Sequence, residues 1–357
     1  MKYAIVGCGR IAPSHLSAAI KNNYDIVAVC DIKPKAMDNL LGKYNLQDQG
    51  IARYTDYKEM IEIEKPQIVA VSTESGNHVE IARYVIRKKI ALILEKPMAL
   101  SLSEAEELIH MAENQHVTFA VCQQNRYNVS TQLVKKAIDA GYFGKISHIA
   151  LTVRWARGSG YFEQGDWRGT WEQDGGTLMN QCIHGCDLLR WFGNSQIDSV
   201  SGHLFNHFHP YLEVEDLGLA TVYFTNGIIG TIEGTTNVYD KDLEETISIF
   251  GENGIVKLNG IVAEMIDVWD FKEPDAMELR NLEKTEMYQS VYGNSHENIY
   301  ADMLEALKEN RAPYVDGRCG KDALELVLSI YKSHKEGRAV SLPLKSFSTS
   351  DMKDLIL

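Results

Sequence analysis

The stretch KYAIVGCGRIAPSHLSAAIKNNYDIVAVCD, residues 2–31, decides the fold of this chain. Residues 2–6 form a short apolar run with β-branched and aromatic side chains, which is typical of a buried parallel strand. A glycine turn follows, and then a helix over residues 12–21. Residues 24–30 form a second apolar strand with an acid directly after it. The stretch therefore predicts a strand, a turn, a helix and a second strand.

The turn fits the pattern G-x-G-x-x-G/A, with Gly7, Gly9 and Ala12 at the three fixed positions. The first glycine makes the tight turn, the second lets a pyrophosphate approach, and the small third residue lets the helix pack on the strand. Asp31 follows the second strand, where an acid can hydrogen-bond a ribose hydroxyl. We therefore predict a bound dinucleotide, with an ordinary tight turn as the alternative. NAD is favoured because Asp31 repels a 2′-phosphate, although Lys33 keeps NADP open.

Strands and helices continue to alternate up to residue 123. We expect strands at 52–54, 68–72, 91–95 and 118–122, and helices at 33–44, 56–64, 78–88 and 103–115. Helices between nearly continuous apolar strands predict an α/β fold with a doubly wound parallel sheet. The first predicted domain therefore spans residues 1–123.

The pattern changes after that point, and residues 124–357 predict a second domain of α+β type. Its expected helices are 129–140, 178–192, 295–308 and 321–336, and its expected strands are 146–154, 197–206, 217–225, 228–236, 245–250 and 255–258. Turn signals such as Asn226-Gly227 separate these strands, which predicts a large, mostly antiparallel open sheet. The prediction leaves open that the last two helices pack back on the first domain.

Composition limits the partners of the chain. Its 36 Lys and Arg and 49 Asp and Glu give a formal net charge of −13. We therefore expect no sequence-independent binding to nucleic acid or to an anionic membrane. No apolar run is long enough for a membrane span or a signal peptide, which makes the cytoplasm the expected compartment. The six cysteines include no C-x-x-C pair and are expected to be reduced core thiols.

One set of candidate residues follows the strands of the first domain, because ligands bind beyond the carboxyl ends of parallel strands. They are Ser72, Thr73, Glu95, Lys96, Gln123, Asn125 and Arg126. Pro97 favours an extended backbone at Lys96, which gives the lysine a fixed direction. A solvated lysine at a strand end is the alternative reading of Lys96.

A second cluster lies on the helix predicted at 178–192. Asn180, His184 and Asp187 are spaced by four and three residues, so they share one stripe of that helix. The histidine can accept a proton from a hydroxyl while Asp187 or Asn180 fixes its tautomer. A buried histidine satisfied by Asp187 is the alternative.

A third cluster is basic and aromatic. It comprises Arg154, Trp155, Arg157, Asp166, Trp167, Arg168 and Trp171. Several arginines in an acidic chain suit a phosphate-bearing substrate, because guanidinium binds phosphate in a bidentate fork. The indole rings offer stacking surfaces. The alternative is a loop packed at a subunit or domain contact.

No metal site is predicted. Cys182 and Cys186 share a helix face, but His184 between them points to the other side. His203, His207 and His209 lie near a strand, and we expect a loop or a surface strand there rather than a set of metal ligands.

With these residues identified, the chain resembles the Gfo/Idh/MocA oxidoreductases along nearly its full length. The resemblance rests on GCGRIA at residues 7–12, on Glu95-Lys96-Pro97, and on the pattern GG-x-x-x-N-x-x-x-H-x-x-D that begins at Gly175. Further segments resemble the branch that oxidises the 3-hydroxyl of UDP-N-acetylglucosaminuronic acid for bacterial surface polysaccharides. These segments are Arg154-Trp155, 166–171, Met179-Asn180-Gln181, 213–216 and 251–254.

The resemblance implies a Rossmann domain, a second domain whose open sheet makes subunit contacts, and a homodimer or homotetramer. It implies NAD bound by Gly7, Gly9, Arg10, Ile11, Asp31, Ser72, Thr73, His78, Glu95, Lys96 and Gln123. It implies a nucleotide sugar bound by Asn125, Arg126, Arg154, Trp167, Arg168, Asn180, Gln181 and His184. The implied catalytic set is Lys96, His184 and Asn180.

In this interpretation Lys96 stabilises the developing alkoxide and His184 takes the proton, with the two roles open to exchange. Many relatives have aspartate at the position of Asn180. An amide cannot titrate, and without that carboxylate His184 more readily stays neutral. Two alternatives remain, a dehydrogenase of a free sugar or cyclitol and a non-catalytic dinucleotide-binding regulator. Whether NAD is exchanged at each turnover or is recycled in place by a 2-oxo acid also stays open.

Overall fold

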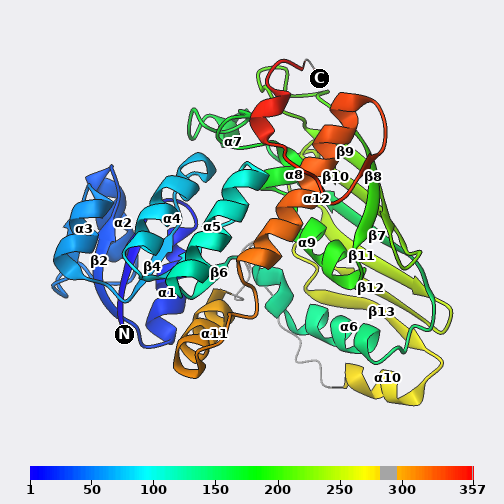
Figure 1. Ribbon diagram of the computed structural model, residues 1–357, viewed down its shortest axis with the longest axis horizontal. Helices are drawn as coiled ribbons and strands as arrows, with labels where there is room; N and C mark the ends of the chain where they lie inside the picture. Colours follow the sequence, from blue (N-terminus) through cyan, green and yellow to red (C-terminus); the bar gives the residue numbers. More distant parts are fainter. Residues whose placement is uncertain (282–295, 356) are drawn as a thin grey trace. The chain divides into compact units, whose positions relative to one another are not determined.

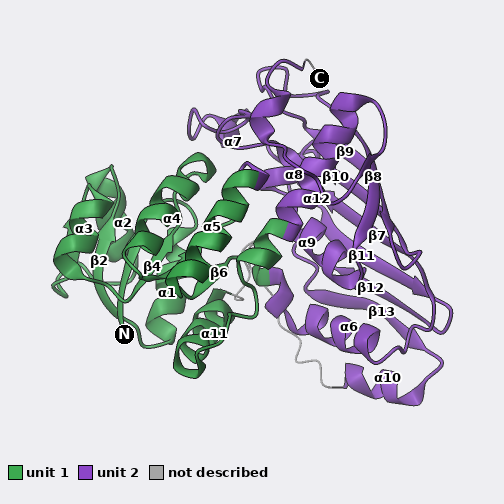
Figure 2. Ribbon diagram, viewed as in Figure 1, with its two compact units in different colours: residues 1–99, 103–124, 294–321 green, residues 100–102, 125–293, 322–357 purple. Residues whose placement is uncertain are grey.

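The computed structural model describes residues 1–281, 296–355 and 357. These residues divide into two compact units, coloured separately in Figure 2. Unit 1 consists of residues 1–99, 103–124 and the described part of 294–321; unit 2 consists of residues 100–102, the described part of 125–293, and the described part of 322–357. The boundary expected at residue 123 differs from this division, because a late segment of the chain also belongs to unit 1.

Unit 1 contains a six-stranded parallel sheet in the order β3-β2-β1-β4-β5-β6. Its strands are β1 (Lys2–Val6), β2 (Asp25–Cys30), β3 (Ala52–Tyr54), β4 (Ile68–Val71), β5 (Ala91–Leu94) and β6 (Phe119–Val121). This order is that of the doubly wound dinucleotide-binding fold. The predicted parallel sheet is therefore confirmed.

The helices of unit 1 are α1 (Ala12–Lys21), α2 (Pro34–Lys43), α3 (Tyr57–Glu64), η1 (Ser75–Asn77), α4 (His78–Arg87), α5 (Leu102–Gln115), which begins one residue before the unit resumes, and α11 (His296–Glu309). Although α11 comes late in the chain, it packs against α1 within this unit (Figure 1). The sequence analysis expected that helix at 295–308, and its first residue, Ser295, lies outside the described residues.

The turn after β1 requires glycine at its first position. Gly7 has φ +92°, and a Cβ there would lie 2.6 Å from the carbonyl carbon of Ser72. The backbone of the turn therefore touches the end of β4 directly. Any side chain at this position would both strain the backbone and separate the two strand ends.

Unit 2 contains an eight-stranded sheet in the order β13-β12-β11-β7-β10-β9-β8-β14. Its strands are β7 (Ile146–Arg154), β8 (Ile197–Phe205), β9 (Leu217–Phe224), β10 (Ile229–Thr235), β11 (Glu244–Gly251), β12 (Gly254–Asn259), β13 (Met265–Phe271) and β14 (Val340–Ser341). Among the described strands of this sheet only β7 and β10 pair in parallel. The predicted, mostly antiparallel sheet is confirmed, but β13 and β14 were not predicted.

The helices of unit 2 are α6 (Val129–Asp139), α7 (Ser159–Phe162), α8 (Thr177–Asn180), α9 (Ile183–Phe192), α10 (Pro274–Arg280), most of α12 (Gly317–Glu336), and two 3-10 turns, most of η2 (Gln124–Tyr127) and η3 (Thr349–Met352). Helices α6, α8 and α9 pack on the sheet (Figure 1). No helix in the described part of the chain is long and apolar enough to cross a membrane.

Alternation along β7 sorts its side chains between the two faces of the sheet. Ile149, Leu151 and Val153 are buried, and a Cβ on Gly185 of α9 would touch the last two of them. The face with these residues is thus the one that α9 covers. Arg154 follows Val153 and belongs to the opposite face, as does Glu233 on the neighbouring β10.

The single helix predicted at 178–192 is wrong, because the helix breaks at Gln181 and Cys182. The backbone N–H of Gln181 and that of Cys182 both donate to the carbonyl of Thr177, and regular bonding resumes only when Cys186 donates to Cys182. Asn180 therefore ends α8, whereas His184 and Asp187 both lie on α9. The three residues do not share one continuous helix, as the sequence analysis expected.

A buried acid supports the start of α8. Gly176 has φ +94°, and a Cβ there would lie 2.0 Å from Oε2 of Glu215. The backbone N–H of Leu178 donates to Oε1 of the same carboxyl group at 2.8 Å. The hydroxyl of Tyr331 lies 2.8 Å from that oxygen and also contacts the carbonyl of Gly175. A carbonyl can only accept, so both contacts of this single hydroxyl are satisfied when Glu215 is protonated.

Burial agrees with that protonation, since it raises the pKa of Glu215 from 4.5 to about 8. A group whose pKa is raised by folding contributes stability that is complete below its unfolded pKa and is lost as the pH rises through the folded value. We expect unfolding free energy to fall between pH 4.5 and pH 8 by as much as about 1.4 kcal/mol per pH unit from this group.

The variant Glu215→Gln should remove this part of the pH dependence, because the amide is neutral throughout and of similar size. Denaturant unfolding of wild type and variant at pH 5, 7 and 9 measures the difference. The exposed Glu252→Gln serves as the control and should follow wild type. Parallel curves for Glu215→Gln and wild type would contradict the buried neutral carboxyl.

Candidate functional site

Three of the predicted dinucleotide residues of unit 1, Gly7, Asp31 and Ser72, meet around the first turn. The backbone N–H of Cys8 donates to Oδ2 of Asp31 at 2.8 Å, and the N–H of Lys33 donates to Oδ1 at 2.8 Å. The hydroxyl of Ser72 donates to the carbonyl of Gly7 at 2.8 Å. Two backbone N–H groups thus hold the carboxylate of Asp31 in place, and Asp31 itself is partly exposed.

The start of α1 is suited to a pyrophosphate. A Cβ on Gly9 would meet no atom within 4 Å, so there is open space beside the backbone at this point. No side chain caps the N-terminus of α1 at Ile11. Backbone N–H groups at an uncapped helix N-terminus bind anions. The turn, the open space and Asp31 together fit a dinucleotide, and the exposed Arg10 stands beside them.

Lys96 directly follows Glu95 at the end of β5. Its backbone N–H donates to Oε2 of Glu95 at 3.2 Å, and its side chain is partly exposed while Glu95 is buried. The carbonyl of Pro97, on the other side, lies 2.8 Å from Nδ1 of the buried His78. The second nitrogen of His78 lies 3.1 Å from the carbonyl of Thr73. The polar side-chain atoms of His78 and Glu95 therefore have hydrogen-bond partners inside unit 1.

Glu95 also joins two buried histidines. Its Oε1 lies 2.9 Å from Nε2 of His15 and 3.1 Å from Nε2 of His296. Burial alone would raise the pKa of Glu95, but hydrogen bonds from these histidines outweigh it and hold the pKa well below its usual value. Burial lowers the pKa of His15. The carboxylate is therefore charged and has two imidazole partners.

Cys122 lies beside this group, and the four side chains could in principle hold a metal ion, their nearest ligand atoms being within 4.8 Å of one another. Two ligands of one tetrahedral zinc ion lie about 3.3 Å apart, given metal distances of about 2.0 Å. The 2.9 Å and 3.1 Å contacts here are shorter and match hydrogen bonds. We therefore interpret the group as a hydrogen-bonded network.

The polar residues at the start of α8 gather around Asp174, which the sequence analysis did not select. The side-chain amide of Asn180 donates to Oδ1 of Asp174, and the backbone N–H of Gly169 donates to Oδ2 at 2.7 Å. Asp174 is buried. Its position just before Gly175-Gly176 was the available signal, because an acid beside a glycine turn commonly accepts backbone hydrogen bonds.

Tyr161 connects two of the predicted sugar-binding residues in unit 2. Its hydroxyl accepts from Nη1 of Arg168 and, at 3.1 Å, from the amide of Gln181. The Arg168 guanidinium carbon lies 4.2 Å from the centroid of the Tyr161 ring and 4.3 Å from that of Trp167. In the part of the chain that the structure describes, no carboxylate forms an ion pair with Arg168. The cluster thus combines a cation with two aromatic rings.

Arg126 and Asp187 form a buried bidentate ion pair. Nε and Nη2 of the arginine donate to the two carboxylate oxygens at 2.7 Å and 2.6 Å. Burial raises the pKa of Asp187, and the nearby guanidinium offsets that effect. Asp187 was expected to orient His184, which is itself buried, but its oxygens accept from Arg126 instead. The sequence analysis did not predict this ion pair, because Arg126 and Asp187 are 61 positions apart in the chain.

Arg154 forms ion pairs with two carboxylates on the opposite face of the sheet. It donates to both oxygens of Glu233 and to Glu244, each at 2.7 Å, and these carboxylates raise its pKa. Arg157 likewise donates to Asp242 at 2.6 Å. The structure does not bring Arg154 together with Asn180 and Arg168, since helices α8 and α9 cover the other face of the sheet.

The remaining predicted residues have the following places. Gln123 is buried after β6, and Asn125 lies in η2 with its amide 3.5 Å from Glu245. His207 and His209 follow the end of β8 in a loop. His209 lies 3.2 Å from Asp216 and 2.7 Å from the carbonyl of Arg157; burial lowers its pKa, but these hydrogen bonds raise the pKa above its usual value. It therefore holds loops together.

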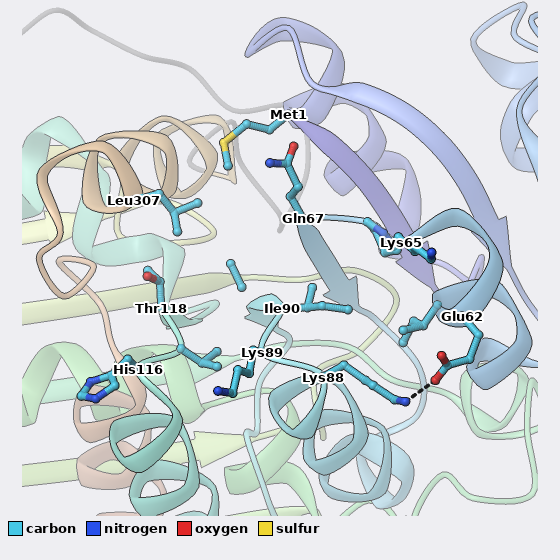
Figure 3. Close-up of a pocket in the computed structure, with 14 residues that line it drawn as sticks. Met1, Glu62, Lys65, Gln67, Lys88, Lys89, Ile90, His116, Thr118 and Leu307 are labelled. Atoms are coloured by element: carbon cyan, nitrogen blue, oxygen red, sulfur yellow. Dashed lines mark ion pairs between the residues drawn. The ribbon is translucent and has the colours of Figure 1, made fainter.

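A pocket of about 580 Å³ lies elsewhere in unit 1, and none of the predicted cofactor or sugar residues lines it (Figure 3). It is formed around the first residues of β5 and the ends of α3, α4 and α5. Lys65, Lys89 and His116 end these three helices with φ of +49°, +56° and +55°. Basic residues at helix C-termini interact favourably with the helix dipole, which accounts for the charge of this pocket.

The comparisons with known proteins agree for both units. The oxidoreductase family with an NAD-binding Rossmann fold matches residues 1–123, and the GFO/IDH/MocA C-terminal domain matches residues 131–257. Among curated proteins, the myo-inositol 2-dehydrogenase of Thermotoga maritima is 21% identical over 96% of this chain and 98% of its own length.

Two solved structures are similar along nearly the whole chain. One is the WlbA dehydrogenase from Bordetella pertussis in complex with NADH and UDP-GlcNAcA, which is 31% identical with a TM-score of 0.85. The match covers 97% of this chain and 99% of that chain. The WlbA dehydrogenase from Chromobacterium violaceum, with the same two ligands, is 33% identical with a TM-score of 0.86 over 97% of this chain and 96% of that one. These matches and the dinucleotide turn of unit 1 show that the chain belongs to the Gfo/Idh/MocA oxidoreductase family and is a dehydrogenase whose cofactor is NAD.

Proposed function

We propose that this dehydrogenase oxidises the 3-hydroxyl of UDP-N-acetylglucosaminuronic acid to the 3-keto sugar. The observation that carries the proposal is the similarity, above 30% identity and along 97% of the chain, to two dehydrogenases determined with NADH and UDP-GlcNAcA. The cluster of Tyr161, Trp167 and Arg168 supports it, because a cation between aromatic rings suits a nucleotide diphosphate.

In the proposed reaction the turn at Gly7 and the carboxylate of Asp31 would hold NAD, which would supply the hydride acceptor for the carbon that bears the hydroxyl. His184 takes the hydroxyl proton, and Lys96 donates a hydrogen bond to the oxygen as negative charge develops on it. Asn180 binds the sugar through an amide that cannot titrate. Its contact with Asp174 fixes the orientation of that amide. The roles of Lys96 and His184 are exchangeable in this scheme.

Among the arginines proposed for the anionic groups of the substrate, Arg168 has the strongest support. Arg126 and Arg154 already have carboxylate partners at 2.7 Å or less. Arg168 contacts a phenol oxygen and two aromatic rings instead. A phosphate or uronate that approaches Arg168 therefore displaces no carboxylate.

The proposed product is a precursor of amino sugars in bacterial surface polysaccharides. We place the reaction in the cytoplasm as part of the same proposal. All six cysteines lie in the described residues and are free thiols, which fits a reducing compartment.

The relative that acts on an inositol favours a second candidate, a cyclitol dehydrogenase. Thermal unfolding separates the two functions, because a ligand that binds only the folded protein raises the midpoint. We expect NAD to raise the midpoint, UDP-N-acetylglucosaminuronic acid to raise it further, and myo-inositol to add nothing to the effect of NAD. A further rise with myo-inositol and none with the nucleotide sugar would favour the cyclitol.

The same measurement tests Arg168. The variant Arg168→Met should lose most of the rise caused by the nucleotide sugar while the rise caused by NAD persists. Arg338→Met is the control, since it removes an exposed guanidinium of unit 2 that belongs to no proposed site. Equal losses in the two variants would remove Arg168 from the proposed sugar-binding set.

Replacement of the proposed catalytic side chains should lower turnover without loss of cofactor binding. Lys96→Met and His184→Gln should each reduce kcat by about 100-fold or more, because each removes proton transfer or charge stabilisation in the transition state. Steady-state rates and NAD titration by fluorescence measure the two effects. Lys89→Met, an exposed lysine at the end of α4, is the control. Near-normal kcat in either variant would exclude that residue from the reaction.

We also propose that the open face of the unit 2 sheet joins copies of the chain into a homodimer or homotetramer. Leu219, Tyr223 and Ile229 are 39%, 42% and 40% exposed on this face, and Tyr223 pairs directly with Ile229 across β9 and β10. An apolar patch of this kind is typical of an interaction surface.

A charged residue in this patch should weaken the assembly. We expect the double variant Leu219→Glu, Tyr223→Glu to sediment as a smaller species than wild type in analytical ultracentrifugation. Ile63→Glu is the control, because Ile63 is 59% exposed in unit 1, away from this sheet. An unchanged sedimentation coefficient for the double variant would contradict the proposed interface.

A further inference from the structure

Four buried side chains of unit 1 converge on the backbone around Lys96. His15, His78 and His296 are 0%, 1% and 2% exposed, and Glu95 is 5% exposed. Buried histidine and carboxylate are costly unless each has a partner. Their partners here include the backbone N–H of Lys96 itself and the carbonyl of the next residue, Pro97.

The first contact acts through Glu95. Its Oε2 accepts the backbone N–H of Lys96 at 3.2 Å, while Oε1 is held by His15 at 2.9 Å and His296 at 3.1 Å. His15 is oriented in turn, because its Nδ1 lies 2.8 Å from the hydroxyl of Tyr300. The two histidines therefore keep the carboxylate charged and prevent it from rotating away from the Lys96 peptide.

The second contact comes from the other direction. Nδ1 of His78 lies 2.8 Å from the carbonyl oxygen of Pro97, which is closer than its Nε2 lies to Thr73. A carbonyl only accepts, so the proton of a neutral His78 belongs on Nδ1 for the shorter bond. Glu95 and His78 thus hold two points of the backbone, one on each side of the Lys96 side chain.

We propose that His15, His78 and His296 are positioning residues for Lys96. They fix the backbone from which the lysine side chain leaves β5, and so the place that its ammonium group reaches in the reaction. The inference rests on the proposed function of Lys96. It gives Glu95 and His78 a role in orienting Lys96 rather than in contacting NAD through their polar side-chain atoms. A displacement of the lysine by about 1 Å is enough to cost about 100-fold in rate.

Paired amide variants test the proposal, because asparagine and glutamine each reproduce one ring nitrogen. The amide nitrogen of asparagine lies near the position of Nδ1, and that of glutamine near Nε2. At position 78 the contact with Pro97 uses Nδ1, so His78→Gln should lose more kcat than His78→Asn. At position 15 the contact with Glu95 uses Nε2, so His15→Gln should retain kcat and His15→Asn should lose it.

We expect the two mismatched variants to lose about 10- to 100-fold in kcat, with little change in the KM for the nucleotide sugar or in the Kd for NAD. Tyr24→Phe is the matched control. It removes one buried hydrogen bond of 2.8 Å to the carbonyl of Tyr300 in the same core but touches neither contact to the Lys96 backbone. Its kcat should equal that of wild type. Equal kcat for asparagine and glutamine at both positions would overturn the proposal.

Hydrogen exchange supplies a readout that does not depend on catalysis. The amide of Lys96 should exchange at least about tenfold faster in His15→Asn than in His15→Gln, because only in His15→Asn does Glu95 lose the hydrogen-bond donor at position 15. Faster exchange in His15→Asn with full activity in Lys96→Met would leave the orienting contacts standing and refute the proposed role of Lys96. Equal exchange in both variants, with Lys96→Met inactive, would refute the orienting contacts and leave the proposed function standing.

Discussion

The close approach of two parallel strand ends is the constraint on which unit 1 depends. Gly7 lies against the backbone of Ser72, so the turn after β1 and the residues after β4 share one small region. Parallel strands all point their carboxyl ends to the same edge, which brings residues from distant parts of the chain together there. Asp31 joins them because the backbone of the turn donates to its carboxylate. The sheet thus brings together Gly7, Asp31 and Ser72, which are predicted to bind the dinucleotide.

Buried ionisable groups organise the next level of both units. Glu95 is charged because two histidines donate to it, whereas Glu215 has backbone and phenol partners and is held neutral by burial. Arg126 and Asp187 compensate each other within a buried pair. An unpaired group of this kind would cost several kcal/mol. Each pair therefore specifies one arrangement of the loops and helices that carry the candidate residues.

The fold of unit 2 separates two arginines that lie close together in the sequence. Arg154 and Arg168 are fourteen positions apart and both belong to the basic, aromatic segment. Alternation along β7 puts Arg154 on the face with Glu233, while helices α8 and α9 cover the other face. Arg168 instead lies with Tyr161 and Gln181. The sequence alone does not distinguish the two arginines, but the fold gives them different partners.

The sequence by itself determined the features that depend on neighbours in the chain. The glycine turn, the alternation of strands and helices, the acid after β2 and the polar residues after each strand all follow from local backbone chemistry and side-chain periodicity. These features were enough to predict the parallel sheet, the mostly antiparallel second sheet and the dinucleotide residues. They also predicted one helix over 178–192, and this failed because a short irregularity at Gln181 and Cys182 leaves no clear mark on periodicity.

Only the tertiary structure decided which polar groups pair. Asp187 bonds Arg126 across 61 positions, Glu215 bonds Tyr331 across 116, and Glu95 bonds His296 across 201. The physical reason is that a buried charge takes whichever partner the packed fold brings within about 3 Å, and sequence spacing carries no information about that distance. The chain thus supplies candidate residues, but it does not supply the partners that set their charge and orientation.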